Sequence, residues 1–126
     1  MILSPFVVNG ETWKVERVAP GDPRLIDRTG EPRLATADPG SLTVAISNRV
    51  FPPLLDKVIL HEVAHAVSMS HGSLDQMRKA VPEDYWVSVE EWNAWFVENH
   101  AIEAIELASE VLGRPVCVEG LCARRL

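Results

Sequence analysis

The pentapeptide His61-Glu62-Val63-Ala64-His65 constrains this chain more than any other feature of its sequence. It has the form HExxH, with its two histidines four positions apart. On an α-helix such residues lie on the same face one turn apart, so both imidazoles can reach one metal ion while Glu62 lies at its open side. Burying two imidazoles and a carboxylate in so apolar a helix would cost several kcal/mol without a divalent metal to compensate them. The pattern therefore predicts a helix that carries a metal site.

Length and composition fit one compact domain, expected to span residues 1–126. Hydrophobic residues make up 47% of the chain and charged residues 24%, as in ordinary globular proteins. The net charge of −6 argues against nucleic acid or an anionic membrane as the main partner, and favours a protein or peptide. The N-terminus lacks the basic and long apolar segments of a signal peptide, and no stretch is long enough for a membrane helix. A cytoplasmic location is therefore expected.

The first half of the chain carries signals for β-strands separated by turns. Asn9-Gly10 is a strong hairpin signal, flanked by residues 6–8 and 12–18. Residues 34–36 and 42–47 indicate a second hairpin. In the last of these segments apolar side chains alternate with small and polar ones, which fits a sheet packed on helices along one face. The same alternation fits an edge strand that could pair with an extended peptide.

The second half of the chain changes to a helical period. A helix can start at Pro52-Pro53 and continue through the HExxH segment to about residues 70–72. A short helix is expected near residues 74–79, and a long one from a cap at Ser88 to Leu112. The tryptophans of this last helix are interpreted as core residues. The predicted fold class is α+β, with an N-terminal antiparallel sheet packed on the HExxH helix and a long C-terminal helix.

Two cysteines, Cys117 and Cys122, lie near the C-terminus. Their spacing would allow a small disulfide loop or a share in a second metal site, but a single CxxxxC pair is a weak zinc signal. In a reducing compartment we expect two reduced thiols in a turn around Gly120. No chemistry is assigned to them.

A catalytic zinc site needs three protein ligands and one open position, so another residue must complete the HExxH pair. His71 lies ten positions after the first motif histidine, which is the spacing of the metzincin motif HExxHxxGxxH. Ser68, however, occupies the position where that motif has a glycine to break out of the helix. Glu91 on the last helix is the other main candidate, and Glu90 and Glu98 remain open.

The segment Glu91-Trp92-Asn93-Ala94-Trp95-Phe96 resembles the E-x-N-x-F motif of small gluzincins, with Trp95 in place of the motif's phenylalanine. In particular, it is similar to the minimal-zincin peptidases of phage and mobile elements that act against immunity repressors. The resemblance covers roughly residues 12–112 and is loose outside this segment and HExxH. It implies a zincin-like fold and zinc as the cofactor. It also implies that Glu91 is the third ligand beside His61 and His65.

These observations predict a zinc metallopeptidase that hydrolyses peptide bonds of a protein substrate. Glu62 would act as the general base on metal-activated water, and Tyr85 and His100 are candidate donors to the oxyanion. The alternative is a non-catalytic zincin-fold module that acts by protein–protein contact. The intact Glu62 favours the enzyme, whereas the small size of the chain favours the module.

Overall fold

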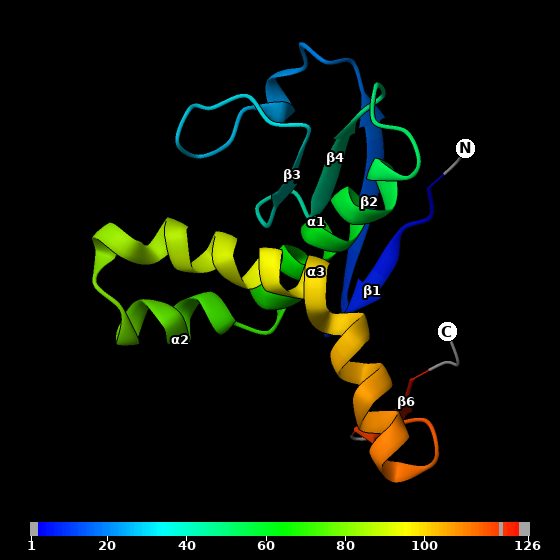
Figure 1. Cartoon of the computed structure of the whole chain (residues 1–126). Coiled ribbons are helices and arrows are strands. Elements are labelled where there is room, and N and C mark those ends of the chain that lie inside the picture. Colours follow the sequence, from blue (N-terminus) through cyan, green and yellow to red (C-terminus); the bar gives the residue numbers. More distant parts are fainter. Residues whose placement is uncertain (1–2, 119, 124–126) are drawn as a thin grey trace.

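A computed structural model describes residues 3–118 and 120–123 of the chain (Figure 1). The described part is mixed α+β, with a small sheet in its first half and a long helix, α3, toward its C-terminal end. The expected domain of residues 1–126 includes a few residues that lie outside this described part.

The main sheet has the strand order β1-β2-β4-β3. β1 (Phe6–Val8) and β2 (Glu11–Val18) pair antiparallel. The Asn9-Gly10 turn between them has positive φ at both residues, as a two-residue hairpin turn of type I′ requires. β3 (Ala35–Asp38) and β4 (Thr43–Ser47) form a second antiparallel pair. Both hairpins predicted from the sequence are therefore confirmed.

The sheet as a whole is mixed, which corrects the expectation of an antiparallel sheet. β2 and β4 run parallel, from Lys14 opposite Thr43 to Val18 opposite Ser47. β4 thus lies between β2 and β3 and is not an edge strand. The period of two along a strand determines which face is buried, but it carries no information on which strands lie alongside. On this side of the sheet the edge is β3.

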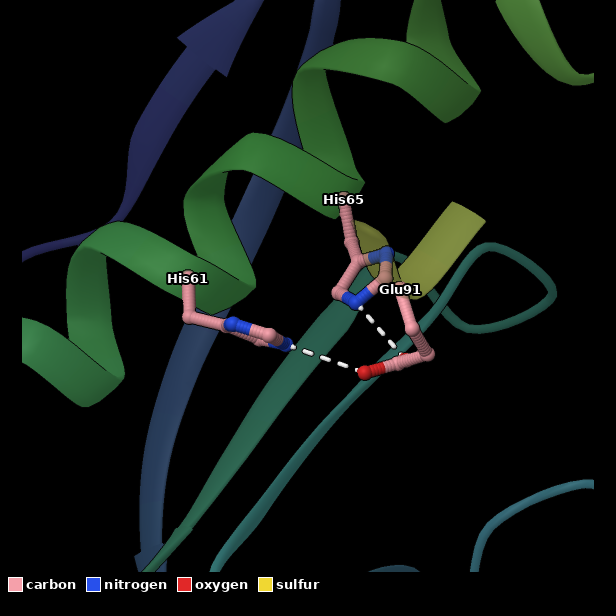
Figure 2. Close-up of side chains that lie close together, drawn as sticks. All are labelled: His61, His65 and Glu91. Carbon is pink, nitrogen blue, oxygen red and sulfur yellow. Dashed lines mark ion pairs between the residues drawn. The ribbon is translucent and has the colours of Figure 1, made fainter. Parts of the chain in front are cut away.

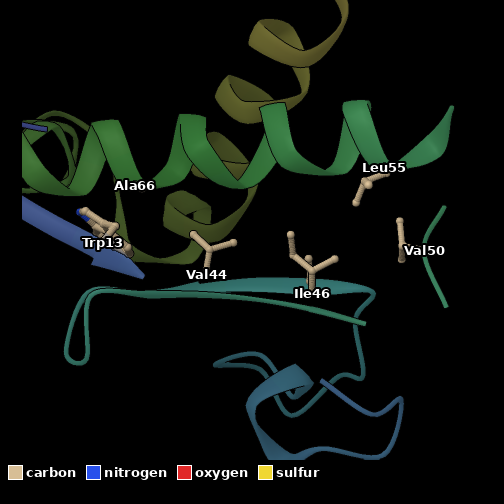
Figure 3. Close-up of a cluster of buried hydrophobic side chains, with 7 residues drawn as sticks. Trp13, Val44, Ile46, Val50, Leu55 and Ala66 are labelled. Atoms are coloured by element: carbon tan, nitrogen blue, oxygen red, sulfur yellow. The ribbon is translucent and has the colours of Figure 1, made fainter. Parts of the chain in front are cut away.

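The HExxH motif lies on α1 (Leu54–Ser70), which packs across the sheet. The indole Nε1 of the fully buried Trp13 donates to Ser70 Oγ at 2.8 Å, which ties the end of α1 to β2. Each buried side chain of Val, Leu or Ile size stabilises the fold by about 1.5–3 kcal/mol. The core between sheet and helix consists of Trp13, Ala35, Val44, Ile46, Val50, Leu55 and Ala66 (Figure 3).

Two further helices follow α1, close to where they were predicted. α2 (Ser73–Ala80) begins after Gly72, and α3 (Trp86–Leu112) ends at a left-handed Gly113. The predicted cap of α3 is wrong, because the helix begins before Ser88 and no side chain in the described part of the chain caps it. Instead the indole Nε1 of Trp86 donates to the carbonyl of Val81 at 2.7 Å, a contact that the capping pattern does not encode.

The tryptophans in the middle of α3 are not core residues, which contradicts their interpretation from the sequence. Trp92 is 61% exposed and Trp95 is 48% exposed. The buried residues of α3, Glu90 and Ala94, both lie in its first half. The second half, orange in Figure 1, extends away from the sheet. Apolar spacing predicted a buried face here, but spacing does not show whether another element covers it.

A short hairpin of β5 (Cys117–Val118) and β6 (Leu121–Cys122) follows α3. Cys117 lies directly opposite Cys122 in this hairpin, and the two sulfurs form a disulfide. The expectation of two reduced thiols is therefore wrong, because the turn at Gly120 brings the cysteines into register. Within the described residues, no helix has the length and apolar character needed to cross a membrane.

Candidate metal centre

The candidate site lies between α1 and the first half of α3. Figure 2 shows His61 and His65 one turn apart on α1, both directed toward Glu91 of α3. His61 Nε2 is 3.3 Å from one carboxylate oxygen of Glu91, and His65 Nε2 is 3.1 Å from the other. One ligand atom from each of the three residues can be chosen so that all lie within 4.8 Å of one another. The three side chains thus converge on one small space.

The spacing and chemistry of these ligand atoms fit a zinc ion. Ligands bound tetrahedrally to zinc at about 2.0–2.2 Å lie about 3.3–3.6 Å from one another. The nitrogen–oxygen separations of 3.3 and 3.1 Å in this site are close to that range. Two imidazoles and one carboxylate are a donor set that zinc accepts, and three protein ligands leave a fourth position open. His61, His65 and Glu91 would hold the ion.

The other ring nitrogen of each histidine faces a further glutamate of α3. His61 Nδ1 is 3.2 Å from Glu98, and His65 Nδ1 is 3.5 Å from the buried Glu90. The second oxygen of Glu90 accepts a hydrogen bond from Arg28 at 2.6 Å. Carboxylates in this position fix the ring orientation and tautomer of metal-binding histidines. Glu90 and Glu98, left open as third ligands by the sequence, therefore lie in contact with Nδ1 and not between the Nε2 atoms.

Sequence reasoning missed this orienting role. Glu91 and Glu98 are seven positions apart and so share one face of α3, a spacing that was visible in the sequence. Arg28 had no such signal, because it comes from the irregular segment between β2 and β3, whose position depends on tertiary structure.

The motif glutamate, Glu62, lies on the wall of a pocket of about 730 Å³ that also exposes the three candidate ligands. Its side chain is largely buried, with the residue only 7% exposed. Burial raises the pKa of the Glu62 carboxyl, while the charges of His65 and His61 oppose the rise. A raised pKa makes a carboxylate a better proton acceptor near neutral pH, as general base catalysis requires.

The histidines and Glu91 shift each other's pKa strongly in the metal-free site. Burial disfavours charged His65, but its contacts with Glu90 and Glu91 outweigh burial and raise its pKa to about 9. Contact with Glu91 also raises the pKa of His61. The two imidazoles hold the pKa of Glu91 well below its ordinary value. Positive charge on the histidines thus favours the charged form of Glu91, and a divalent cation would supply that positive charge with both imidazoles neutral.

Three residues considered from the sequence lie outside the site. His71 is an exposed residue at the C-terminal end of α1, which continues past Ser68, and His71 does not join the described His and Glu cluster. The metzincin arrangement is therefore not formed. Tyr85 is 59% exposed, and neither Tyr85 nor His100 lies on the pocket wall. Neither is placed to donate to an oxyanion beside Glu62.

Comparison with known proteins found no protein-family model, no curated protein and no solved structure that matches this chain.

Proposed function

We propose that this chain is a zinc-dependent endopeptidase with a zincin-like fold. The observation that carries the proposal is the convergence of His61, His65 and Glu91 beside the buried Glu62 on one pocket wall. Bound there, zinc would polarise the scissile carbonyl and lower the pKa of water. The resemblance of the HExxH and Glu91 segments to those of minimal-zincin anti-repressor peptidases supports the same activity.

Residues of the chain would carry out proton transfer and orient the metal-binding histidines. Glu62 takes the proton of the attacking water and passes it to the leaving amine. Its burial favours this role, because a desolvated carboxylate binds a proton more readily. Glu98 and Glu90 lie on the Nδ1 side of His61 and His65, at 3.2 and 3.5 Å, where a carboxylate would direct both Nε2 atoms toward Glu91.

The peptide substrate lies along β3 in this proposal. The residues that line the pocket include 35–38 of β3 and, on α1, His61, Glu62 and His65. As an edge strand, β3 has backbone groups on its outer side that can pair with an extended peptide. The strand at residues 42–47, considered for this role from its sequence, is β4 and is paired on both sides.

The alternative of a zincin-fold module that binds a protein partner without cleaving it has one supporting observation. Aromatic side chains on the outer face of α3 are exposed, with Trp92 stacked on Phe96 at a centroid distance of 5.7 Å. Exposed apolar patches often mark protein–protein contacts. An enzyme can also use such a surface, so catalysis remains the main proposal.

The Glu62→Gln variant tests the proposal against this alternative. We expect it to bind zinc as the wild type does, measured as metal content after dialysis, while cleavage of a degenerate peptide mixture falls by about 10²–10⁴-fold. Mass spectrometry of the mixture reports the cleavage. A wild type that binds zinc and cuts no peptide, with a Glu62→Gln variant that retains full biological effect, would establish the binding module instead.

A further inference from the structure

Three arginines from the segment between β2 and β3 line the pocket that contains the candidate site: Arg24, Arg28 and Arg33. They share a segment and a cavity wall, but they differ in how many of their guanidinium nitrogens are already engaged by the protein. That difference separates a structural arginine from two that can bind a ligand.

Arg24 is fully engaged. Its Nε and one Nη donate to the two oxygens of Asp22, at 3.1 Å each, and its other Nη pairs with Glu16. All three guanidinium nitrogens therefore have carboxylate partners. Arg24 joins Asp22 of its own segment to Glu16 of β2.

Arg33 and Arg28 are each held by one bond. Arg33 Nε donates to Asp27 at 2.6 Å, and one Nη of Arg28 donates to Glu90 at 2.6 Å. Among the described residues, the two Nη groups of Arg33 and the remaining nitrogens of Arg28 donate to no protein acceptor. The side chains are 49% and 57% exposed. One bond orients each guanidinium, and the other N–H donors stay available.

The aspartates on the same wall are, in contrast, already satisfied. Asp27 accepts from the backbone of Thr29 and Glu31 and from Arg33. Asp38 accepts from the backbone of Gly40 and the hydroxyl of Ser41. This part of the wall therefore has spare donors and few spare acceptors, although the chain as a whole is acidic.

Arg33 lines the same pocket as Glu62 and Glu91. A ligand group that binds Arg33 would therefore lie in the cleft that contains the candidate metal site.

We propose that Arg33 and Arg28 bind a carboxylate of the peptide that lies along β3. The carboxylate is either an Asp or Glu side chain or the C-terminal carboxylate of the peptide. The planar guanidinium fork matches two carboxylate oxygens. The neighbouring Glu62 and Glu91 would repel a dianionic phosphate more than a singly charged carboxylate. The inference rests on the proposed function in that it places a peptide in this cleft.

The test measures peptide binding rather than cleavage. The full-length, zinc-treated Glu62→Gln protein is mixed with degenerate octapeptides, one mixture with free and one with amidated C-termini, and retained peptides are sequenced by mass spectrometry. If the bound carboxylate is a side chain, Asp and Glu should be enriched over Asn and Gln at one position in both mixtures. If it is the C-terminal carboxylate, peptides with a free C-terminus should be retained in preference to amidated peptides. We expect an enrichment of roughly tenfold, as for a charge-assisted hydrogen bond.

Two variants and a matched control test whether Arg33 causes the enrichment of acidic peptides. Arg33→Gln should lower it about tenfold and Arg33→Lys, which keeps the charge without the fork, should lower it less. Arg49→Gln, at an exposed arginine outside this pocket, should leave it unchanged. Thermal unfolding of each variant checks that it folds, and Arg33→Lys serves if Arg33→Gln does not.

Each other outcome overturns one proposal and not the other. No retained peptide, no preference for acids in either mixture, or a preference that survives both Arg33 substitutions overturns the carboxylate site. Cleavage by the wild type without acid preference leaves the peptidase standing and overturns only this inference. An Arg33-dependent acid preference in a protein whose wild type cuts nothing supports the carboxylate site and overturns the peptidase.

Discussion

The two halves of α3 have similar apolar content but different surroundings. In the first half, Ala94 is 1% exposed against α1, and Glu90, Glu91 and Glu98 reach its histidines. In the second half, Leu107 is 53% exposed and Val111 is 87% exposed. The difference arises because α1 lies beside the first half only, as Figure 1 shows. Helical periodicity identifies the side chains that a helix can bury, and a neighbouring element decides whether they are buried.

The second half is tied to the C-terminal hairpin rather than to the core. Ser109 Oγ accepts a hydrogen bond from the backbone of Val116 at 3.1 Å, just before β5. The exposed apolar residues around it are the surface available to a partner. If the halves differ as described, substitutions of the same type should have large effects in the first half and small effects in the second.

The largest effect is expected from Glu91→Ala, which removes a candidate metal ligand. Zinc affinity, measured by competition with a chromophoric chelator, should fall at least about a hundredfold, beyond the range for outer-shell partners. Glu103→Ala, at an acid of the second half whose side chain is 69% exposed, should leave the affinity unchanged. Loss of zinc in His71→Ala but not in Glu91→Ala would contradict the assignment of the third ligand.

A smaller effect on the same affinity is expected from Glu98→Ala. Removal of the group 3.2 Å from His61 Nδ1 frees the imidazole to rotate, and zinc affinity should fall about 10–100-fold. Glu106→Ala is the matched control in the second half. Equal affinities for the two variants would mean that Glu98 does not orient His61.

Packing should distinguish the halves in stability as well. Ala94→Leu inserts a larger side chain between α3 and α1 and should lower the free energy of unfolding by about 1–3 kcal/mol in urea titrations. Ala104→Leu, on the exposed second half, should change it by no more than about 0.5 kcal/mol. If Ala104→Leu proved as destabilising as Ala94→Leu, the second half would be covered in solution, for example by a partner or a second copy.

A pH dependence of stability is also expected to arise in the first half. In metal-free protein the pKa of His65 is raised to about 9, above its unfolded value of about 6.5. The stabilisation from charged His65 is therefore complete below about pH 6.5 and is lost as the pH rises through about 9. Urea titrations in chelator should show the free energy of unfolding falling by roughly 3 kcal/mol between these values, at about 1.4 kcal/mol per pKa unit. In the His65→Gln variant this fall in stability should be smaller. A fall that persisted in His65→Gln but vanished in His100→Gln would contradict its assignment to His65.

Some of the fold and site could be predicted because they depend on local chemistry. The Asn9-Gly10 hairpin follows from turn conformation, and the pairing of His61 with His65 follows from helical geometry alone. Glu91 was predicted by resemblance, and the geometry brings it to both Nε2 atoms. The start of α3 and the exposure of Trp92 were predicted wrongly. A contact with Val81 decides the first, and the lack of a covering element among the described residues decides the second.

The sequence by itself determined a helix with two imidazoles and a carboxylate on one side, two hairpins and a long last helix. These features repeat every few residues, so neighbours along the chain are sufficient to specify them. Tertiary structure decided that β4 is central, that Glu90 and Glu98 contact Nδ1, and that Cys117 meets Cys122. It also decided which half of α3 is buried. Each of these depends on which segments lie side by side, and chain periodicity carries no information about that.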